Sequence, residues 1–268
     1  MRIMPDLTDD KIMSLFHKGV KGQWAADELD WSLPFALDEF EKTSFARILT
    51  PVYLGEQTAM AGAAKVIPYF MTAHEHSAQL YLTTFMLDEA RHFEMLTRVY
   101  RLLDRKPLDL RDLREMFQYH YRLLQSNNRV HWLFGILISD LFAKHFYGMF
   151  VRKFRPTLFG QLSIRIIRDE GRHQAFAEHY LYEMSDSMPH EMRQELLKMR
   201  DDLLRIMESM CKKLVSDTET LGFDGYELLQ QLNYDVEKKV RIIGMERDER
   251  SETLANEPEE EDVTIEPV

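Results

Sequence analysis

Apolar residues recur at helical intervals along the chain from about residue 34 onward. The pattern predicts four long helices, over segments 44–70, 72–103, 129–154 and 157–184. The only Asp-Gly pair, at 224–225, follows a helix end and does not join two alternating strands. Glycine (11 residues) and proline (9 residues) are sparse, and we expect the prolines at segment edges, which favours long helices. The sequence therefore predicts an all-α protein, a helical bundle with additional helices.

Shorter periodic segments predict these additional helices. One precedes Gln125 and carries apolar residues at Leu110, Leu113, Met116, Phe117 and Tyr121. Pro189 is expected in the first turn of another helix, with Asp186 or Ser187 near its N-cap, and a last helix covers about 225–245. We predict one domain over residues 1–245, followed by an acidic tail at 246–268 that is too poor in apolar residues to fold.

Segment 130–151 is the most apolar stretch and the closest to a membrane span. Asp140, Lys144 and His145 interrupt it, and such side chains are costly in hydrocarbon. A helix that is apolar on most sides is equally typical of the buried centre of a large bundle. We therefore expect a bundle helix and no membrane partner.

Net charge and cysteine content limit the possible partners of the protein and its cellular compartment. The net charge of −11 argues against nucleic acid as a partner, because phosphate binding needs a concentrated basic surface. Cys211 is the only cysteine, so thiolate clusters and intramolecular disulfides are excluded, and a cytoplasmic location is expected. The N-terminus shows no secretory signal pattern.

The candidate chemistry lies in two similar boxes, DEARH at 88–92 and DEGRH at 169–173. In each box a glutamate and a histidine are three residues apart, so both project from one side of a helix and can reach a single ion. The pairs are Glu89 with His92 and Glu170 with His173. Such Glu-x-x-His pairs on two helices are the ligand pattern of ferritin-like di-iron carboxylate proteins, which need one more carboxylate from each of two other helices.

Two isolated acids meet this requirement. Glu56 is the only acid in segment 44–70, and Asp140 is the only acid in segment 129–154. A buried lone carboxylate is costly unless it is paired or bound to metal. A single ExxH is common and usually faces solvent, but two boxes that each follow an apolar helix with one acid favour a metal site.

The remaining box residues have expected roles around the histidines. A metal-bound imidazole usually donates its second N–H to a carboxylate. We expect Asp88 to pair with His173 and Asp169 with His92, each across to the opposite helix, with Arg91 and Arg172 neutralising the aspartates. Four carboxylates and two imidazoles suit two ions of iron or manganese, do not exclude zinc, and do not suit copper.

These residues resemble the ribonucleotide reductase small-subunit-like branch of the ferritin-like superfamily, over roughly residues 20–185. The stretch QWAADELDWSLPF at 23–35 also resembles that branch, which has a Trp-x-x-x-x-Asp segment before the first ligand helix. The resemblance implies dioxygen activation at an Fe/Fe or Mn/Fe centre, in the manner of its ligand-binding oxidases. It also implies a position for Trp24 near Asp169 as an electron-transfer route, although a core tryptophan is the more common case.

The chain departs from this branch at three places. Leu96 occupies the position where radical-generating subunits usually have a tyrosine, and Ala59 replaces the valine of the valine–tyrosine crosslink of the oxidases. The third-helix glutamate of the branch corresponds to Gly135 or Ile136, one turn before Asp140. Three alternatives remain open for Asp140, namely a direct ligand, a ligand through water, or no ligand, and His145 is a weaker substitute for it.

Without a radical tyrosine, the expected activity is direct oxidation of a small, apolar organic substrate by hydroxylation, N-oxygenation, desaturation or oxidative cleavage. The protein would act as a monooxygenase or oxidase, with O2 as co-substrate. We expect a ferredoxin or reductase as electron donor, because no GxGxxG fingerprint is present. Room beside the metals is expected from the small and aromatic residues Ala59, Gly62, Ala63, Ala64, Phe85, Phe134 and Phe142.

Two alternatives remain open: a radical-generating small subunit of ribonucleotide reductase, and a non-catalytic ferritin-like metal-binding protein. The resemblance also allows for a homodimer. No role is assigned to His17, His74, His76, His120, His131, His179 and His190.

Overall fold

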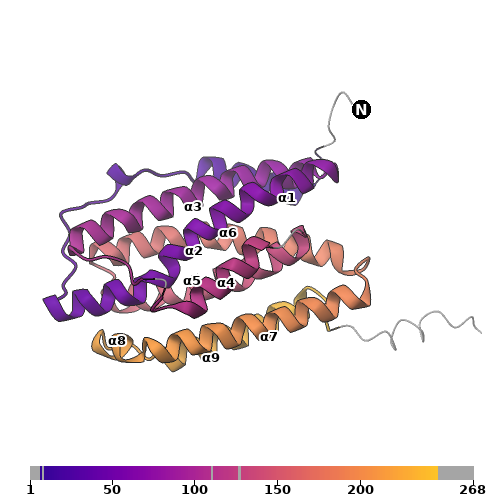
Figure 1. Ribbon diagram of the computed structural model, residues 1–268. Coiled ribbons are helices and arrows are strands. Elements are labelled where there is room, and N and C mark those ends of the chain that lie inside the picture. The colour runs from indigo at the N-terminus through magenta and orange to yellow at the C-terminus, as the bar shows by residue number, and fades with distance from the viewer. Residues whose placement is uncertain (1–6, 8, 110, 126–127, 247–268) are drawn as a thin grey trace, which may run out of the picture.

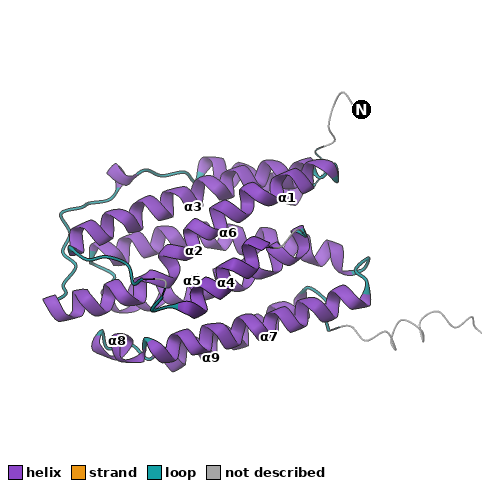
Figure 2. Cartoon of the chain, in the orientation of Figure 1, coloured by secondary structure: helices purple, strands orange, loops and turns teal. Residues whose placement is uncertain are grey.

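The protein is all-α over its described residues, and its long helices run side by side in a bundle (Figure 1). The computed structural model describes residues 7, 9–109, 111–125 and 128–246. In these residues only helices, turns and loops occur, with no strand (Figure 2). The predicted tail lies, apart from Glu246, outside the described residues, as does Leu110.

Four helices form the bundle that carries the predicted ligands. They are α2 (Glu39–Thr72), α3 (His76–Leu103), α5 (Arg129–Phe154) and α6 (Leu158–Ser185). Helix α2 packs against α3 and α5 against α6, and contacts between α2 and α5 and between α3 and α6 join the two pairs. The four segments predicted from helical periodicity match these helices to within about five residues at each end.

The helix ends follow from local side-chain chemistry. Asp38 accepts hydrogen bonds from the backbone N–H groups of Phe40 and Glu41 and forms a capping box with Glu41 at the start of α2. Asn128 and Thr157 cap α5 and α6 in the same way. Asp104 ends α3 in the left-handed conformation, with φ of 51°.

The prediction that proline lies at helix edges is wrong for α2, which contains Pro51 and Pro68. An interior proline removes one backbone hydrogen bond and usually kinks a helix. Helix α2 packs against α3, α5 and two of the outer helices and continues past Pro51, which is buried and lines the cavity described below.

The outer helices cover the two sides of the bundle. Helix α1 (Asp10–Lys21) packs on α3 and α6, and a strap containing the 3-10 helix η1 (Ala26–Glu28) connects it to α2. On the other side lie α4 (Arg114–Gln125), α7 (His190–Lys213), α8 (Val215–Thr220) and α9 (Gly225–Ile242), of which α7 to α9 form the orange layer in Figure 1.

Three details of the outer helices differ from the prediction. Helix α1 lies before the residue at which helical periodicity was expected to begin. Pro189 is the N-cap of α7 and does not lie in its first turn. Helix α4 buries Met116, Tyr119, His120 and Leu123, whereas Phe117 and Tyr121 are more than half exposed.

Helix α5 is the one described helix long and apolar enough to cross a membrane. However, 67% of its most apolar window is buried within the protein. It contacts α2 and α6 on one side and α4, α7 and α9 on the other, so its apolar character is explained by packing on all sides.

Candidate metal centre

The six predicted ligands come together in the middle of the bundle. Glu56 extends from α2, Glu89 and His92 from α3, Asp140 from α5, and Glu170 and His173 from α6. None of the six is more than 5% exposed. Helical spacing explains the convergence, because each Glu-x-x-His pair projects from one helix face toward the helix opposite.

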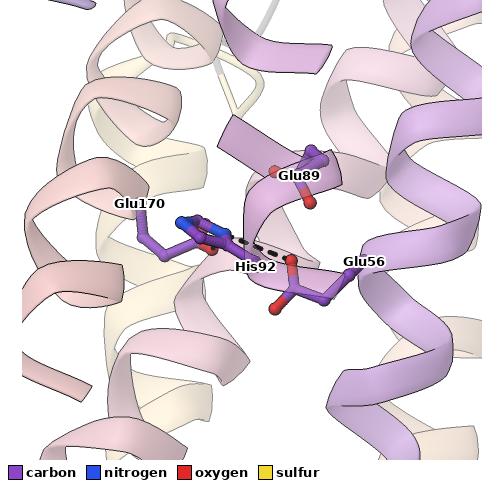
Figure 3. Close-up of side chains that lie close together, drawn as sticks. All are labelled: Glu56, Glu89, His92 and Glu170. Carbon is purple, nitrogen blue, oxygen red and sulfur yellow. Dashed lines mark hydrogen bonds and ion pairs between the residues drawn. The ribbon is translucent and has the colours of Figure 1, made fainter. Parts of the chain in front are cut away.

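The donor atoms fall into two groups that share Glu170. Glu56, Glu89, His92 and Glu170 form the first group, and Asp140, Glu170 and His173 form the second, each with its donor atoms within 4.8 Å of one another. Figure 3 shows the first group, with the His92 ring between Glu56 and Glu170. Glu89 also reaches the second group, because its Oε1 lies 3.1 Å from His173 Nδ1. Glu89 and Glu170 are therefore placed to bridge two ions.

Several donor atoms have no other role in the structure. Glu89 Oε1, Glu170 Oε2 and His173 Nδ1 are buried and contact only one another, at 3.1 and 3.3 Å from the nitrogen, and the buried Asp140 Oδ2 makes no hydrogen bond to any described residue. Buried polar atoms are otherwise nearly always satisfied, so a cluster of unsatisfied acceptors requires a cation or protons. Carboxylate oxygens and imidazole nitrogens are ligands that suit iron and manganese, so the residues present fit such ions.

The two aspartates hold the imidazoles in the orientation that metal binding needs. Asp88 Oδ2 lies 3.3 Å from His173 Nε2, and Asp169 Oδ2 lies 3.3 Å from His92 Nε2. These are the two crosswise pairs expected from the sequence. If Nε2 carries the proton, each Nδ1 presents its lone pair to the centre. The Nδ1 of His92 is 3.3 Å from Glu56 and 3.5 Å from Glu170.

Two buried arginines neutralise the aspartates. Arg91 donates to Asp88 at 2.5 Å and to Asp169 at 2.8 Å, and Arg172 donates to the same two carboxylates at 2.8 Å. Burial alone would raise the pKa of both aspartates, but the hydrogen bonds from the histidines and the charge of Arg172 hold both pKa values well below the usual range. Both carboxylates therefore stay ionised and accept from the histidines.

The strap before α2 completes this network. Trp24 is buried, and its indole N–H donates to Asp169 at 2.7 Å, so the chain Trp24–Asp169–His92 is continuous. The Arg91 guanidinium lies 4.7 Å above the Trp24 ring. Gln23, which the sequence analysis did not single out, donates to Asp88 at 2.9 Å and accepts from Arg91.

The carboxylates of the centre differ in the direction in which their surroundings shift their pKa values. Burial and the charge of Glu56 raise the pKa of Glu89 well above its usual value, and burial and the charge of Glu170 do the same for Asp140. Burial also opposes ionisation of Glu56, but the charge of His92 and hydrogen bonds, one of them from Tyr147, lower its pKa. Without a cation, the site therefore cannot hold all its carboxylates in the charged form cheaply.

Asp140 and His145 behave differently, although both were considered as the third-helix ligand. Asp140 lies in the second donor group. His145 instead points to α9, where its Nε2 lies 3.1 Å from Asp235, which also pairs with Lys144 at 2.9 Å. The five-residue offset from Asp140 turns His145 away from the centre.

Tyr147 is a residue of the site that sequence analysis missed. It is fully buried on α5 and donates a hydrogen bond of 3.0 Å to Glu56 Oε1. Burial raises its pKa well above the usual value, so the hydroxyl stays protonated and acts as a donor. The only signal in the sequence is its position seven residues, two helical turns, after Asp140.

An apolar cavity of about 60 Å³ adjoins the centre. Glu56, Glu89, Asp140 and Glu170 reach it from one side, and side chains of α2, α4, α5 and α7 form the rest of its wall, among them Ala59, Met116, Ile136, Phe142, Met207 and Met210. Of the residues expected to leave room beside the metals, Ala59 and Phe142 line this cavity.

The other residues expected there have packing roles. The ring of Phe85 lies 4.3 Å from that of His173, and Gly62 lies against Trp132. Phe134 and Ala63 are buried outside the cavity wall, and Ala64 is exposed. None of these five residues lines the cavity: four have the helix-packing role that is the more common case for such residues, and Ala64 is exposed to solvent.

Comparison with known proteins identifies the fold. No family model matches the sequence, and no curated protein matches it. Among solved structures, the chain is similar to an R2-like ligand-binding oxidase with an aerobically reconstituted Mn/Fe cofactor, at 18% identity and a TM-score of 0.75, covering 88% of this chain and 94% of the other. The same oxidase after photoconversion gives 17% identity and a TM-score of 0.76, with the same coverage. The fold is therefore the ferritin-like fold of the ribonucleotide reductase small-subunit type.

Proposed function

We propose that this protein is a dioxygen-activating oxidase or monooxygenase with a dinuclear Fe/Fe or Mn/Fe centre. Its ligands are Glu56, Glu89, His92, Asp140, Glu170 and His173, and its substrate is a small, apolar organic molecule. The observation that carries the proposal is the buried cluster of four carboxylates and two imidazoles, whose oxygen and nitrogen atoms face one another and include the unpaired Asp140 Oδ2. The similarity to oxidases with a Mn/Fe cofactor supports it.

When bound, two such ions supply the redox chemistry that reduces dioxygen. Glu56, Glu89, His92 and Glu170 would hold one ion, and Asp140, Glu170 and His173 would hold the other, with Glu89 in contact with both groups. Asp88 and Asp169 keep the imidazole N–H groups turned away from the centre, and the two arginines keep these aspartates ionised. The apolar wall of the cavity excludes water and favours an apolar substrate.

The electron donor would be a ferredoxin or reductase. Trp24 offers a route for electrons, because its indole bonds Asp169, which bonds His92. We infer a cytoplasmic location from the single cysteine and from the burial of α5.

One observation favours the radical-generating alternative. Leu96, at the usual tyrosine position, is fully buried and cannot store a radical, but Tyr147 donates to a predicted ligand from another helix. A tyrosyl radical detected by electron paramagnetic resonance after oxygen exposure, and absent in Tyr147→Phe, would support this alternative. Substrate oxidation without such a radical supports the oxidase.

The first test is metal content. Protein supplied with iron and manganese should carry about two equivalents per chain, and Glu89→Ala should lose them. Glu94→Ala is the matched control, because Glu94 lies on the same helix but is exposed and pairs with Arg98. Ferrous-loaded wild-type protein should then consume dioxygen in a single turnover, whereas Glu89→Ala should not. Absence of metal in the wild type would contradict the proposal.

A further inference from the structure

The wall of the cavity contains a buried histidine without a hydrogen-bond partner. His120 lies on α4, is 9% exposed and lines the cavity. Neither of its ring nitrogens bonds to any described residue. The other two fully buried histidines, His92 and His173, each hold an aspartate through Nε2. His120 is thus polar where its packing alone would favour an apolar side chain.

The other buried side chains of α4 are either apolar or have their polar group hydrogen-bonded. Met116 and Leu123 are apolar, and the Tyr119 hydroxyl bonds Ser139 at 2.5 Å. A buried imidazole without a partner destabilises the folded protein, and a leucine or phenylalanine would avoid that cost. The ring nitrogens of His120 can therefore be satisfied only by water or by a molecule bound in the adjoining cavity, which makes His120 a candidate binding residue.

The environment of His120 defines the kind of group it can bind. Burial lowers its pKa to about 4, so the imidazole is neutral near pH 7 and offers one N–H donor and one acceptor nitrogen. A hydroxyl, carbonyl or amide suits this pair. A carboxylate would need a positive imidazole, which burial opposes.

The same cavity joins His120 to the metal centre. Asp140 and Glu56 line it as well as His120, and most of the remaining wall is apolar, with Ile136, Met207 and Met116 among its side chains. A cavity of about 60 Å³ is smaller than the roughly 150 Å³ that holds a benzene ring, so the flexible side chains of Met116 and Met207 would have to move to admit one. A molecule in this space would have its apolar body between the two polar ends.

We propose that His120 is a substrate-binding residue that hydrogen-bonds one neutral polar group of an otherwise apolar substrate, whose body lies in the cavity next to the centre. The substrate class is therefore a small apolar molecule with a hydroxyl, carbonyl or amide group, rather than a hydrocarbon or a carboxylate. That the bound molecule is a substrate rests on the proposed function. Its binding at His120 does not require metal.

Phenol and toluene are suitable probes, because they have nearly the same size and differ in one hydroxyl group. Binding of each to metal-loaded wild-type protein is measured by calorimetry, beside His120→Phe, His120→Gln and Met116→Leu. We expect the wild type to bind phenol about tenfold more tightly than toluene. His120→Phe should bind both equally, His120→Gln should keep part of the preference, and Met116→Leu, which changes the same wall without a polar group, should keep all of it.

Two outcomes would overturn the proposal. Equal affinity of the wild type for phenol and toluene would mean that His120 does not hydrogen-bond the hydroxyl group. A preference that survives in His120→Phe would place the hydroxyl at the metal centre instead. His120→Leu provides the same comparison should the phenylalanine variant not fold.

If the proposed oxidase function is wrong, the same experiments give a result that differs from the failure of the His120 proposal. A protein without metal would show no dioxygen uptake, but its preference for phenol would remain and would still depend on His120. Measuring the probes with His92→Ala therefore separates the two proposals, since His92 is a predicted ligand that does not line the cavity and its removal leaves His120 in place.

Discussion

Tyr147 shows how a residue outside the ligand set controls the geometry of a ligand. Its hydroxyl donates to Glu56 Oε1, while Glu56 Oε2 lies 3.3 Å from His92 Nδ1. One oxygen of Glu56 is thus held by α5 and the other remains directed at the centre. Groups that orient a ligand in this way typically change metal affinity when they are removed.

Tyr147→Phe should therefore weaken metal binding by about tenfold, and removing the donor should destabilise the metal-free protein by about 1 kcal/mol. Competition with a chelator measures the affinity, and denaturant unfolding measures the stability. Tyr119→Phe is the matched control, because its hydroxyl bonds Ser139 and no ligand. Equal metal affinity in the two variants would show that Tyr147 does not position Glu56.

Asp140 allows a test of the least certain ligand. Its Oδ2 makes no hydrogen bond to a described residue, and it shares the second donor group with Glu170 and His173. Asp140→Asn keeps the size of the side chain but removes the anionic ligand. We expect the metal content to fall from about two equivalents to about one, without a loss of stability in the metal-free protein. Two equivalents in the variant would exclude Asp140 as a required ligand.

At the residue scale, contacts in the site could be predicted from the sequence where helical spacing determines which side chains meet. Glu89 and His92 meet because they are three residues apart, and the pairing of Asp88 with His173 follows from two facing helices. Tyr147 and Gln23 could not be found in this way. They reach Glu56 and Asp88 across 91 and 65 residues of sequence, and such contacts depend on how the helices pack.

Helices were predictable where the apolar period is long, and less so at the edges of the fold. Helix α1 has 12 residues and was missed, although Asp9 is a good N-cap residue and accepts from Ile12 N–H. Helix α8 has only six residues, too few for a period to be visible. In α4, aromatic residues on the exposed side extended the apolar pattern and obscured which face is buried.

The packing of α2 against α5 depends on a close approach at Gly62. A Cβ atom there would lie 2.2 Å from Trp132 Nε1, so Gly62→Ala should force the two helices apart and destabilise the protein by about 1–3 kcal/mol. Gly171 is the contrasting position. It lies within DEGRH on the exposed side of α6, and no atom lies within 4 Å of an added Cβ.

Gly171→Ala converts the second box into the letters of the first and should stabilise the protein by about 0.5–1 kcal/mol, because alanine favours the helix. Its metal content should equal that of the wild type. Thermal unfolding of both glycine variants tests the pair of expectations. Stabilisation by Gly62→Ala would mean that Trp132 can move freely, contrary to its complete burial.

At the scale of the whole molecule, most of the net negative charge of the sequence lies in residues 247–268, whereas the preceding helix α9 contributes apolar side chains to the core. Residues 247–268 contain nine acidic and two basic residues and so carry −7 of the net charge of −11. Helix α9, by contrast, buries Leu228, Leu229, Leu232, Val236 and Val240, and Phe223 just before it lies 4.9 Å from Phe150 of α5. The C-terminal part of the domain thus covers the side of α5 that faces away from the ligands.

Two truncations test whether the domain ends near residue 245, as the sequence predicts. Removal of 247–268 should leave the free energy of unfolding within about 0.5 kcal/mol of the full chain and should leave the metal content unchanged. Removal of 223–268 should unfold or aggregate the protein. Five aliphatic side chains at about 2 kcal/mol each give about 10 kcal/mol of lost burial, which is comparable to the whole stability of a typical domain. Light scattering and denaturant unfolding distinguish these results. A stable, metal-binding protein after the longer deletion would show that α1 to α8 form a complete domain and that the covering of α5 by α9 is not needed to hold the centre.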